Sequence, residues 1–244
     1  RFRISTGFKE DHWVESAECR AGANQVVHHI IVFAVPPGED FFPGNPKTPV
    51  LTGTAPGDMP LILPAGMAKK IPAGSDLIFE MHYTPNGIAQ KDRSSVGFTY
   101  SKEEPKYEVF TIPVHNHSFK IPPGADNYQV DQTYKFRRPA LLLGFMPHMH
   151  LRGKDFLYEA LYPDGKKETL LSIPHYNFNW QAGYRLAEPL SMTEGMKIHM
   201  VAHFDNSSKN PNNPDATKTV TWGDQTWEEM MIGWMDLAYE RKKQ

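Results

Sequence analysis

Residues 26–35 read "VVHHIIVFAV", an almost wholly apolar run rich in β-branched residues, with two adjacent histidines inside it. β-Branched side chains favour the pleated surface of a sheet, so this run predicts a core strand. Comparable short runs recur between turns that contain Pro, Gly or Asn: "SDLIFEMHYT", "KYEVFTI", "ALLLGFM" and "MKIHMVAHF". Long amphipathic helical patterns are missing. Short strands separated by such turns are typical of antiparallel sandwiches, so the sequence predicts an all-β fold.

The length of 244 residues permits one large β domain or two ordinary ones. Two similar phrases, "LPAGMAKKIPAGSDL" at 63–77 and "FKIPPGADNYQV" at 119–130, each place a Pro-Gly turn near a strand. We therefore expect two related halves that meet near residue 112. The predicted domains are residues 1–112 and residues 113–244.

Composition excludes several classes of function. The chain has 26 Lys+Arg against 28 Asp+Glu, which gives no electrostatic footprint for nucleic acid. No apolar run approaches the roughly 18 residues that a membrane helix needs.

The single cysteine, Cys19, cannot form an internal disulfide. Eleven histidines and eleven methionines stand against that one cysteine, and imidazole and thioether together suit copper in both of its oxidation states.

The adjacent histidines His28 and His29 would face opposite sides of a regular strand. For both to bind one ion, the strand must bulge there or the rings must use different nitrogens. The alternative is one core histidine and one surface histidine. His82, before the turn "TPNG" at 84–87, would complete a three-histidine set and on its own would be a surface residue. In the same run, alternation sets Ile78, Glu80 and His82 on a polar face.

His148 and His150 lie two residues apart in "MPHMHLRG" at 146–153, so on a strand both imidazoles point the same way and reach one ion. The alternative is a pair of exposed or hydrogen-bonded histidines. His115 and His117 have the same spacing and compete as a metal clamp. For the other histidines a structural role is the better interpretation, and the methionines of "TWEEMMIGWMDL" at 226–237 predict core by themselves. The histidines with a structural interpretation are His12, His175, His199 and His203.

Taken in order, HH at 28–29, HY at 82–83, HxH at 148–150 and EM at 229–230 form a pattern more specific than any of its parts. With it the chain resembles the copper type II, ascorbate-dependent monooxygenases, the family of dopamine β-monooxygenase and peptidylglycine α-hydroxylating monooxygenase. The resemblance covers nearly the whole chain, and "MPHMHLRGK" and "WEEMM" are similar to bacterial members. It implies two antiparallel β-sandwich (jelly-roll) domains that face each other across a cleft.

The resemblance also implies two copper sites and an activity. One copper, held by His28, His29 and His82, would store and deliver an electron. The other, held by His148, His150 and Met230, would use O₂ to hydroxylate a substrate C–H bond, with ascorbate or another donor as reductant. The choice of Met230 over its neighbour Met231 rests on the resemblance alone.

Two departures from the family pattern bear on the substrate. The amidating members hold a peptide carboxylate with an Arg two residues before the HxH pair and a Tyr four residues after the ligand Met. Met146 and Trp234 occupy those positions here, and they cannot form a bidentate carboxylate clamp. We therefore expect a small apolar or aromatic substrate rather than a glycine-extended peptide, and we expect Met146, Trp234 and Glu80 to line the substrate cleft.

Only 27 residues precede His28, fewer than the family's first domain usually has. We expect the chain to lack early strands, to be a fragment of a longer polypeptide, or to pair with another chain. Bacterial relatives are often preceded by a cytochrome c-like segment, which would be an electron donor in cis or in trans, although this chain has no CxxCH. Export to the periplasm or beyond is implied.

Two alternatives stay open. The same ligands would also suit a non-catalytic copper-binding protein for storage, delivery or electron transfer. A hydrolytic zinc site is the weaker alternative, because no Glu or Asp sits in a recognisable base position beside the histidines and a Met ligand argues against zinc.

Overall fold

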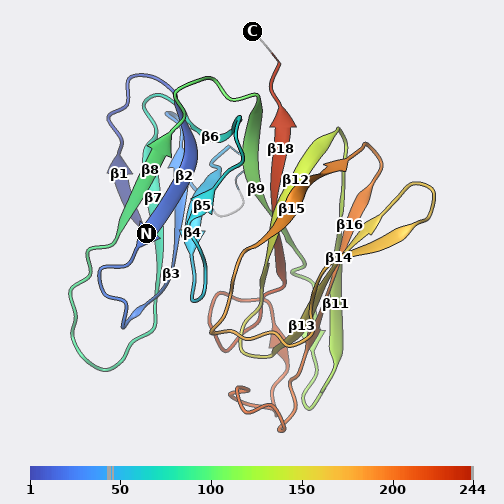
Figure 1. Cartoon of the computed structure of the whole chain (residues 1–244). Helices are drawn as coiled ribbons and strands as arrows, with labels where there is room; N and C mark the ends of the chain where they lie inside the picture. Colours follow the sequence, from blue (N-terminus) through green and yellow to red (C-terminus); the bar gives the residue numbers. More distant parts are fainter. Residues whose placement is uncertain (43–44, 46, 243–244) are drawn as a thin grey trace. The chain divides into compact units, whose positions relative to one another are not determined.

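The computed structural model describes residues 1–42, 45 and 47–242, and in these residues all regular structure is β (Figure 1). The all-β fold predicted from the short apolar runs is confirmed. The strands are β1 (Phe2–Ser5), β2 (His12–Arg20), β3 (Val27–Val35), β4 (Val50–Thr54), β5 (Leu61–Ile62), β6 (Met67–Ile71), β7 (Asp76–Tyr83), β8 (Ser95–Tyr100), β9 (Tyr107–His115), β10 (Lys120–Ile121), β11 (Tyr128–Lys135), β12 (Ala140–His148), β13 (Gly153–Leu161), β14 (Lys167–Ile173), β15 (Tyr184–Met192), β16 (Lys197–Phe204), β17 (Val220–Thr221) and β18 (Ile232–Glu240). Among the described residues, no helix is long and apolar enough to cross a membrane.

The chain divides into two compact units. The first comprises residues 1–112 together with the chain from Asp236 onward, and the second comprises residues 113–235. The chain leaves the first unit within β9 and returns to it within β18. The predicted second domain, residues 113–244, therefore differs from the second unit at its C-terminal end.

Local contacts explain why the C-terminal segment groups with the first unit. The Tyr239 ring packs against Phe110 with 6.0 Å between the ring centroids. The Arg241 guanidinium lies 4.3 Å from the centroid of the Trp13 ring, and its Nη1 donates a hydrogen bond of 2.9 Å to the Pro105 carbonyl. These contacts join residues far apart in the sequence, so no local pattern in the C-terminal stretch predicts them.

In the first unit, β3 lies between β4 and β7 in a sheet of order β1-β7-β3-β4-β9, and β2 pairs with β5, β6 and β8. The described registers in this unit are antiparallel except for β6 and β9, which pair in parallel. Strand β3 is buried on both faces, because Ile30, Val32 and Ala34 enter the main core while Phe33 and Val35 pack in a smaller cluster. That double burial explains the continuous apolar run from which the strand was predicted.

Burial on both faces also corrects one sequence expectation. Ile78 was placed with Glu80 and His82 on a polar face of β7. In the structure it is buried in the smaller cluster with Phe33 and Val35. Within β7, residues 77–79 are buried, whereas Asp76 at one end and residues 80–83 at the other are at least partly accessible.

In the second unit, β11, β16, β13 and β14 form a four-stranded antiparallel sheet, while β12 pairs with β15 and β10 with β17. The largest fully buried side chains of this unit are Phe136, Phe156, Tyr158, Phe204, Ile121, Leu142, Met149, Met192 and Arg152. A charged Arg152 within that set is unusual, since arginine is almost never fully buried unless it is paired.

A buried lysine joins several strands of the first unit, and its removal gives a test of the fold. Lys69 Nζ donates to the Val50 carbonyl (3.2 Å) and to Thr111 Oγ1 (2.6 Å), and it lies 3.9 Å from Asp236 Oδ1. We expect Lys69→Ala to lower the free energy of unfolding by about 3 kcal/mol, because it leaves these buried oxygens without their donor. Urea denaturation measures the change.

Lys70→Ala is the matched control. The neighbouring Lys70 is partly exposed and forms a 2.5 Å ion pair with Asp11. Its loss should cost less than about 1 kcal/mol, as is usual for a surface pair. Equal losses for the two variants would contradict the assigned role of Lys69.

Candidate metal centres

The first group of histidines lies at an irregularity between β3 and β7. Val27 pairs with Tyr83 and His29 pairs with His82, so two steps along β3 match one step along β7 and His28 is the extra residue of a bulge. The bulge turns two adjacent side chains toward each other: His28 Nδ1 and His29 Nδ1 are 3.0 Å apart. The His29 and His82 rings stack with their centroids 3.8 Å apart. The structure therefore brings all three predicted histidines together.

The surroundings favour neutral imidazole at His28. Burial lowers the pKa of His28, and the nearby His82 lowers it further. Neutral imidazole is the form that binds metals. The present ring arrangement is not that of a metal cage, since stacked rings do not direct their lone pairs to one point. Binding an ion at these three residues would require rotation of the rings.

Glu80 lies beside this cluster, and its expected part in a substrate cleft stays a prediction. Its Oε2 accepts a 2.5 Å hydrogen bond from Arg1 Nε, and its Oε1 is 3.6 Å from His82 Nε2. Burial raises the pKa of Glu80, but the contacts with His82 and Arg1 outweigh burial and lower it below the usual value. Glu80 is therefore a carboxylate that faces His82.

The second group lies in the second unit, where β12 ends at His148 and a turn follows. His148 and His150 are 9% and 5% exposed, and their rings are perpendicular with centroids 5.3 Å apart. His150 lies beyond the strand, so strand alternation does not place it as the sequence analysis assumed. Met149 between them is fully buried, and Tyr176 Oη both accepts from its N–H (3.0 Å) and donates to its carbonyl (2.7 Å).

Hydrogen bonds set the tautomers of both imidazoles. His148 Nδ1 is 2.6 Å from Gln181 Oε1. Because Gln181 Nε2 donates to the Phe178 carbonyl (2.9 Å), its Oε1 is the acceptor and His148 carries its proton on Nδ1. His150 Nδ1 lies 3.3 Å from the carbonyl of Glu228, which can only accept. In both rings the lone pair is therefore on Nε2, as in metal-ligating histidines whose other nitrogen bonds to a neighbouring group.

A buried carboxylate connects the His150 turn to the segment that carries Met230. Glu229 is fully buried, and its two oxygens accept the N–H groups of His150 (2.9 Å) and Arg152 (2.6 Å). Burial raises the pKa of Glu229 to about 8, against the opposing effect of these N–H donors. Met230, the next residue, is partly exposed, whereas Met231 is fully buried. The two neighbouring methionines thus point in different directions, with Met231 in the core.

Gln181, Arg152 and Glu229 were not identified from the sequence. The only local signal was the fragment "EM" at 229–230, which the family resemblance used without giving the glutamate a role. Gln181 lies 33 residues from His148 and Glu229 lies 79 residues from His150, so no spacing rule connects them.

Elsewhere in the chain, His115 and His117 form a stacked pair, whereas His199 and His203 contact carboxylates. His115 and His117 stack at 4.1 Å, and His117 stacks at 3.8 Å on Trp222. The His115 and His117 rings are stacked with an angle of 25° between their planes, and their part as a metal clamp stays a prediction. His199 and His203 contact carboxylates, with His203 Nδ1 at 2.6 Å from Asp155 Oδ1 and His199 Nε2 at 3.3 Å from Asp131 Oδ2.

The two other side chains predicted for a substrate cleft lie in the second unit. Met146 and Trp234 are both partly exposed, and the Trp234 carbonyl accepts a 3.4 Å hydrogen bond from Tyr158 Oη. Their part in a substrate cleft stays a prediction.

The described residues contain no group of three or more His, Cys, Asp or Glu side chains arranged to hold a metal ion. Methionine is not one of these four residue types, so this statement does not cover a site that includes Met230. The first cluster fits a metal in its residue types but not in its ring orientation. The second fits in its residue types, with two buried imidazoles whose Nδ1 atoms face acceptors and a partly exposed methionine in the segment tied to His150.

No family model and no curated protein matches the chain. Three solved structures of infectious bursal disease virus align with the chain. They are the Gx strain (8% identity, TM-score 0.28), the VP2 subviral particle (9%, 0.29) and the Gt strain (10%, 0.22). They cover 95%, 97% and 96% of this chain, which spans 58%, 58% and 57% of theirs.

The tautomers can be tested without metal. We expect both His148 and His150 to carry the proton on Nδ1 at pH 8, because Gln181 Oε1 and the Glu228 carbonyl are acceptors. Long-range ¹⁵N–¹H correlation spectra of the imidazoles distinguish the two tautomers. Gln181→Leu should release the constraint on His148 and leave His150 unchanged. A proton on Nε2 of His148 in the unaltered chain would contradict the assignment.

Proposed function

We propose that the chain is a copper-dependent monooxygenase that hydroxylates a C–H bond of a small organic substrate with O₂ and an external reductant such as ascorbate. The proposal rests on the ordered sequence pattern together with one structural observation. Two buried imidazoles, His148 and His150, have their Nδ1 atoms hydrogen-bonded to acceptors, and the segment with Met230 is tied to the same turn through Glu229. Imidazole and thioether donors together suit copper that cycles between its two oxidation states.

His148, His150 and Met230 would hold the catalytic copper, and His28, His29 and His82 would hold a second copper that stores an electron. When bound, copper would supply one-electron redox chemistry and the activation of O₂. Three protein ligands leave open the position that a catalytic metal needs.

The protein's own residues have positioning tasks in this proposal. Gln181 and the Glu228 carbonyl retain the Nδ1 protons, so each ring presents Nε2 in a fixed orientation. The low exposure of His148 and His150 restricts water near the reacting atoms. Phe178 lies at right angles to the His150 ring with 6.1 Å between their centroids and adds an apolar neighbour.

Substrate, donor and location belong to the same proposal. Met146 and Trp234 in place of a carboxylate clamp favour an apolar or aromatic substrate over a peptide carboxylate. A cytochrome c-like protein, in cis or in trans, would supply electrons, and the chain would act in the periplasm or outside the cell. The jelly-roll topology of the two domains and a cleft between them are part of this proposal.

One observation favours a second candidate, a copper-binding protein without catalysis. His29 and His82 are stacked rather than converging. If those rings do not reorient, the first copper site does not form and the chain would hold a single copper for storage, delivery or electron transfer.

Copper stoichiometry separates these candidates. We expect the purified chain to bind two copper ions and to consume O₂ with ascorbate, because each domain supplies one three-residue site. His148→Ala should reduce the stoichiometry to one and abolish the O₂ consumption, and His82→Ala should remove the other ion. One copper per chain, or no turnover with any donor, would favour the carrier.

The identity of the sulfur ligand is tested by two isolated substitutions. Met230→Ile should weaken the copper site that His148→Ala abolishes, since it removes the only proposed thioether donor. Met231→Ile should leave copper binding unchanged, because Met231 is buried in the core and the substitution approximately conserves its volume. Metal titrations with elemental analysis measure copper binding in both variants. Loss of copper in Met231→Ile but not in Met230→Ile would make Met231 the ligand.

A further inference from the structure

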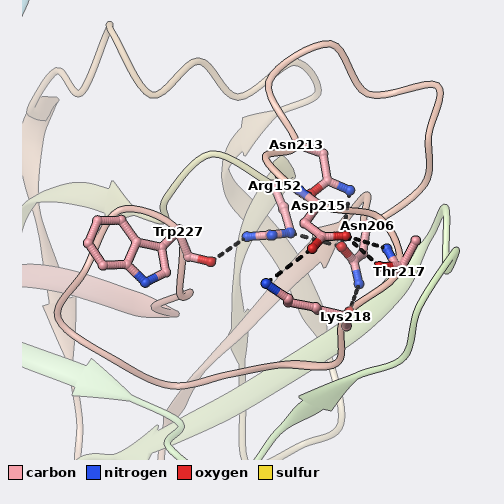
Figure 2. Close-up of polar contacts among 7 residues, drawn as sticks. All are labelled: Arg152, Asn206, Asn213, Asp215, Thr217, Lys218 and Trp227. Atoms are coloured by element: carbon pink, nitrogen blue, oxygen red, sulfur yellow. Dashed lines mark hydrogen bonds and ion pairs between the residues drawn. The ribbon is translucent and has the colours of Figure 1, made fainter.

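Arg152 is 2% exposed, and its side chain spans two segments (Figure 2). Its Nε donates to Asn206 Oδ1 at 2.9 Å, and its Nη1 donates to the Trp227 carbonyl at 2.8 Å. Its backbone is held as well: the N–H donates to Glu229 Oε1 at 2.6 Å, and the carbonyl accepts from the Asp205 N–H at 2.8 Å. A side chain this polar is buried at a cost unless its donors are satisfied, and here the contacts come from two segments that are distant in sequence.

One of those contacts, Asn206, is itself fixed on every side. It is fully buried, and its Nδ2 donates to the carbonyls of Pro122 and Lys218, each at 2.9 Å. Its Oδ1 also accepts from Asn213 Nδ2 at 3.0 Å. Asn206 therefore holds the Arg152 side chain in one orientation and closes the polar loop that follows β16.

The other contacts of Arg152, and those of the neighbouring His150, are made with residues 227–229. The Trp227 carbonyl receives Arg152 Nη1, the Glu228 carbonyl faces His150 Nδ1, and the Glu229 carboxylate receives the N–H groups of His150 and Arg152. Three consecutive residues thus contact one short turn. Met230 follows directly.

We propose that Arg152 and Glu229 are positioning residues, which hold the 148–152 turn against residues 227–229 so that His148, His150 and Met230 converge on one metal ion. The inference rests on the proposed function for the identity of the ligands. A neutral thioether binds weakly and cannot by itself draw two segments some eighty residues apart into register. Prior ordering by the Arg152 and Glu229 contacts removes that entropic cost from metal binding.

Two single substitutions test the proposal. We expect Glu229→Gln and Arg152→Lys each to weaken the His148-dependent copper site about 10- to 100-fold, as is usual when the support of a ligand is lost. The glutamine keeps one acceptor oxygen but faces one of the two N–H groups with its own NH₂, and the lysine cannot reproduce the guanidinium fork. Competition with a copper chelator measures affinity, and the Cu(II) EPR spectrum reports ligand geometry, which a purely structural role would not alter.

Lys154→Met is the matched control. It lies in the same segment, is exposed, and donates only to Asp126 and Asn127. It should retain the copper affinity and the EPR spectrum of the unaltered chain. Asn206→Asp is a milder variant for the case in which Arg152→Lys unfolds the unit. It keeps the buried oxygen that accepts from Arg152, and it should weaken copper binding in the same direction.

Backbone hydrogen exchange of the metal-free chain distinguishes failure of this inference from failure of the proposed function. Faster exchange at the His150 and Arg152 amides in Glu229→Gln, with weaker copper binding, supports the inference. Unchanged copper affinity and EPR spectra in both Glu229→Gln and Arg152→Lys would overturn the inference even if the unaltered chain is an active copper enzyme. If the unaltered chain binds no copper, the proposed function fails, and unchanged amide exchange would refute the positioning contacts separately.

Discussion

The buried Glu229 carboxylate is the interaction on which the second histidine site depends. It lies where water is excluded, so burial disfavours its charge, yet its oxygens accept the backbone N–H groups of His150 and Arg152. A methyl or amide group in its place would leave a backbone donor without an acceptor, which costs about 1–3 kcal/mol for each group. These main-chain contacts therefore fix the backbone of His150 and Arg152, and the backbone in turn sets where the side chains of the candidate site lie.

Much of the fold could be predicted from the sequence, because a strand records its burial in its own residues. The run at 26–35 is continuous because β3 is buried on both faces. The adjacent histidines required a bulge if they were to meet, and the register between β3 and β7 contains one at His28. The prediction for Ile78 was wrong because alternation assumes one wet face, and β7 has none at that position. The return of the chain to the first unit after Asp236 depends on contacts such as Arg241 on Trp13, which leave no trace in local sequence.

In the candidate site, the sequence predicted the two imidazoles but not the groups that hydrogen-bond to them. His148 and His150 can be recognised in the sequence from their residue type and spacing, whereas Gln181 and Asn206 cannot. Asn206 begins a sequence, Asn-Ser-Ser, that fits a glycosylation site, but the structure buries it fully and uses both of its polar atoms inside the protein. A residue whose role is to satisfy other polar groups is recognised by its partners, and two partners of Asn206, Arg152 and Pro122, are 54 and 84 residues away.

The two histidine clusters are assembled by different physical means. Direct strand pairing places His29 opposite His82, and the bulge adds His28, so that cluster needs nothing beyond the sheet that carries it. Its rings contact one another as a result. In the other cluster His148 is the last residue of β12 and His150 lies in the turn beyond it, where the Glu229 carboxyl group accepts the backbone N–H groups of His150 and Arg152. Nδ1 of each ring faces an acceptor, Gln181 Oε1 for His148 and the Glu228 carbonyl for His150, so polar contacts rather than ring stacking orient these two imidazoles.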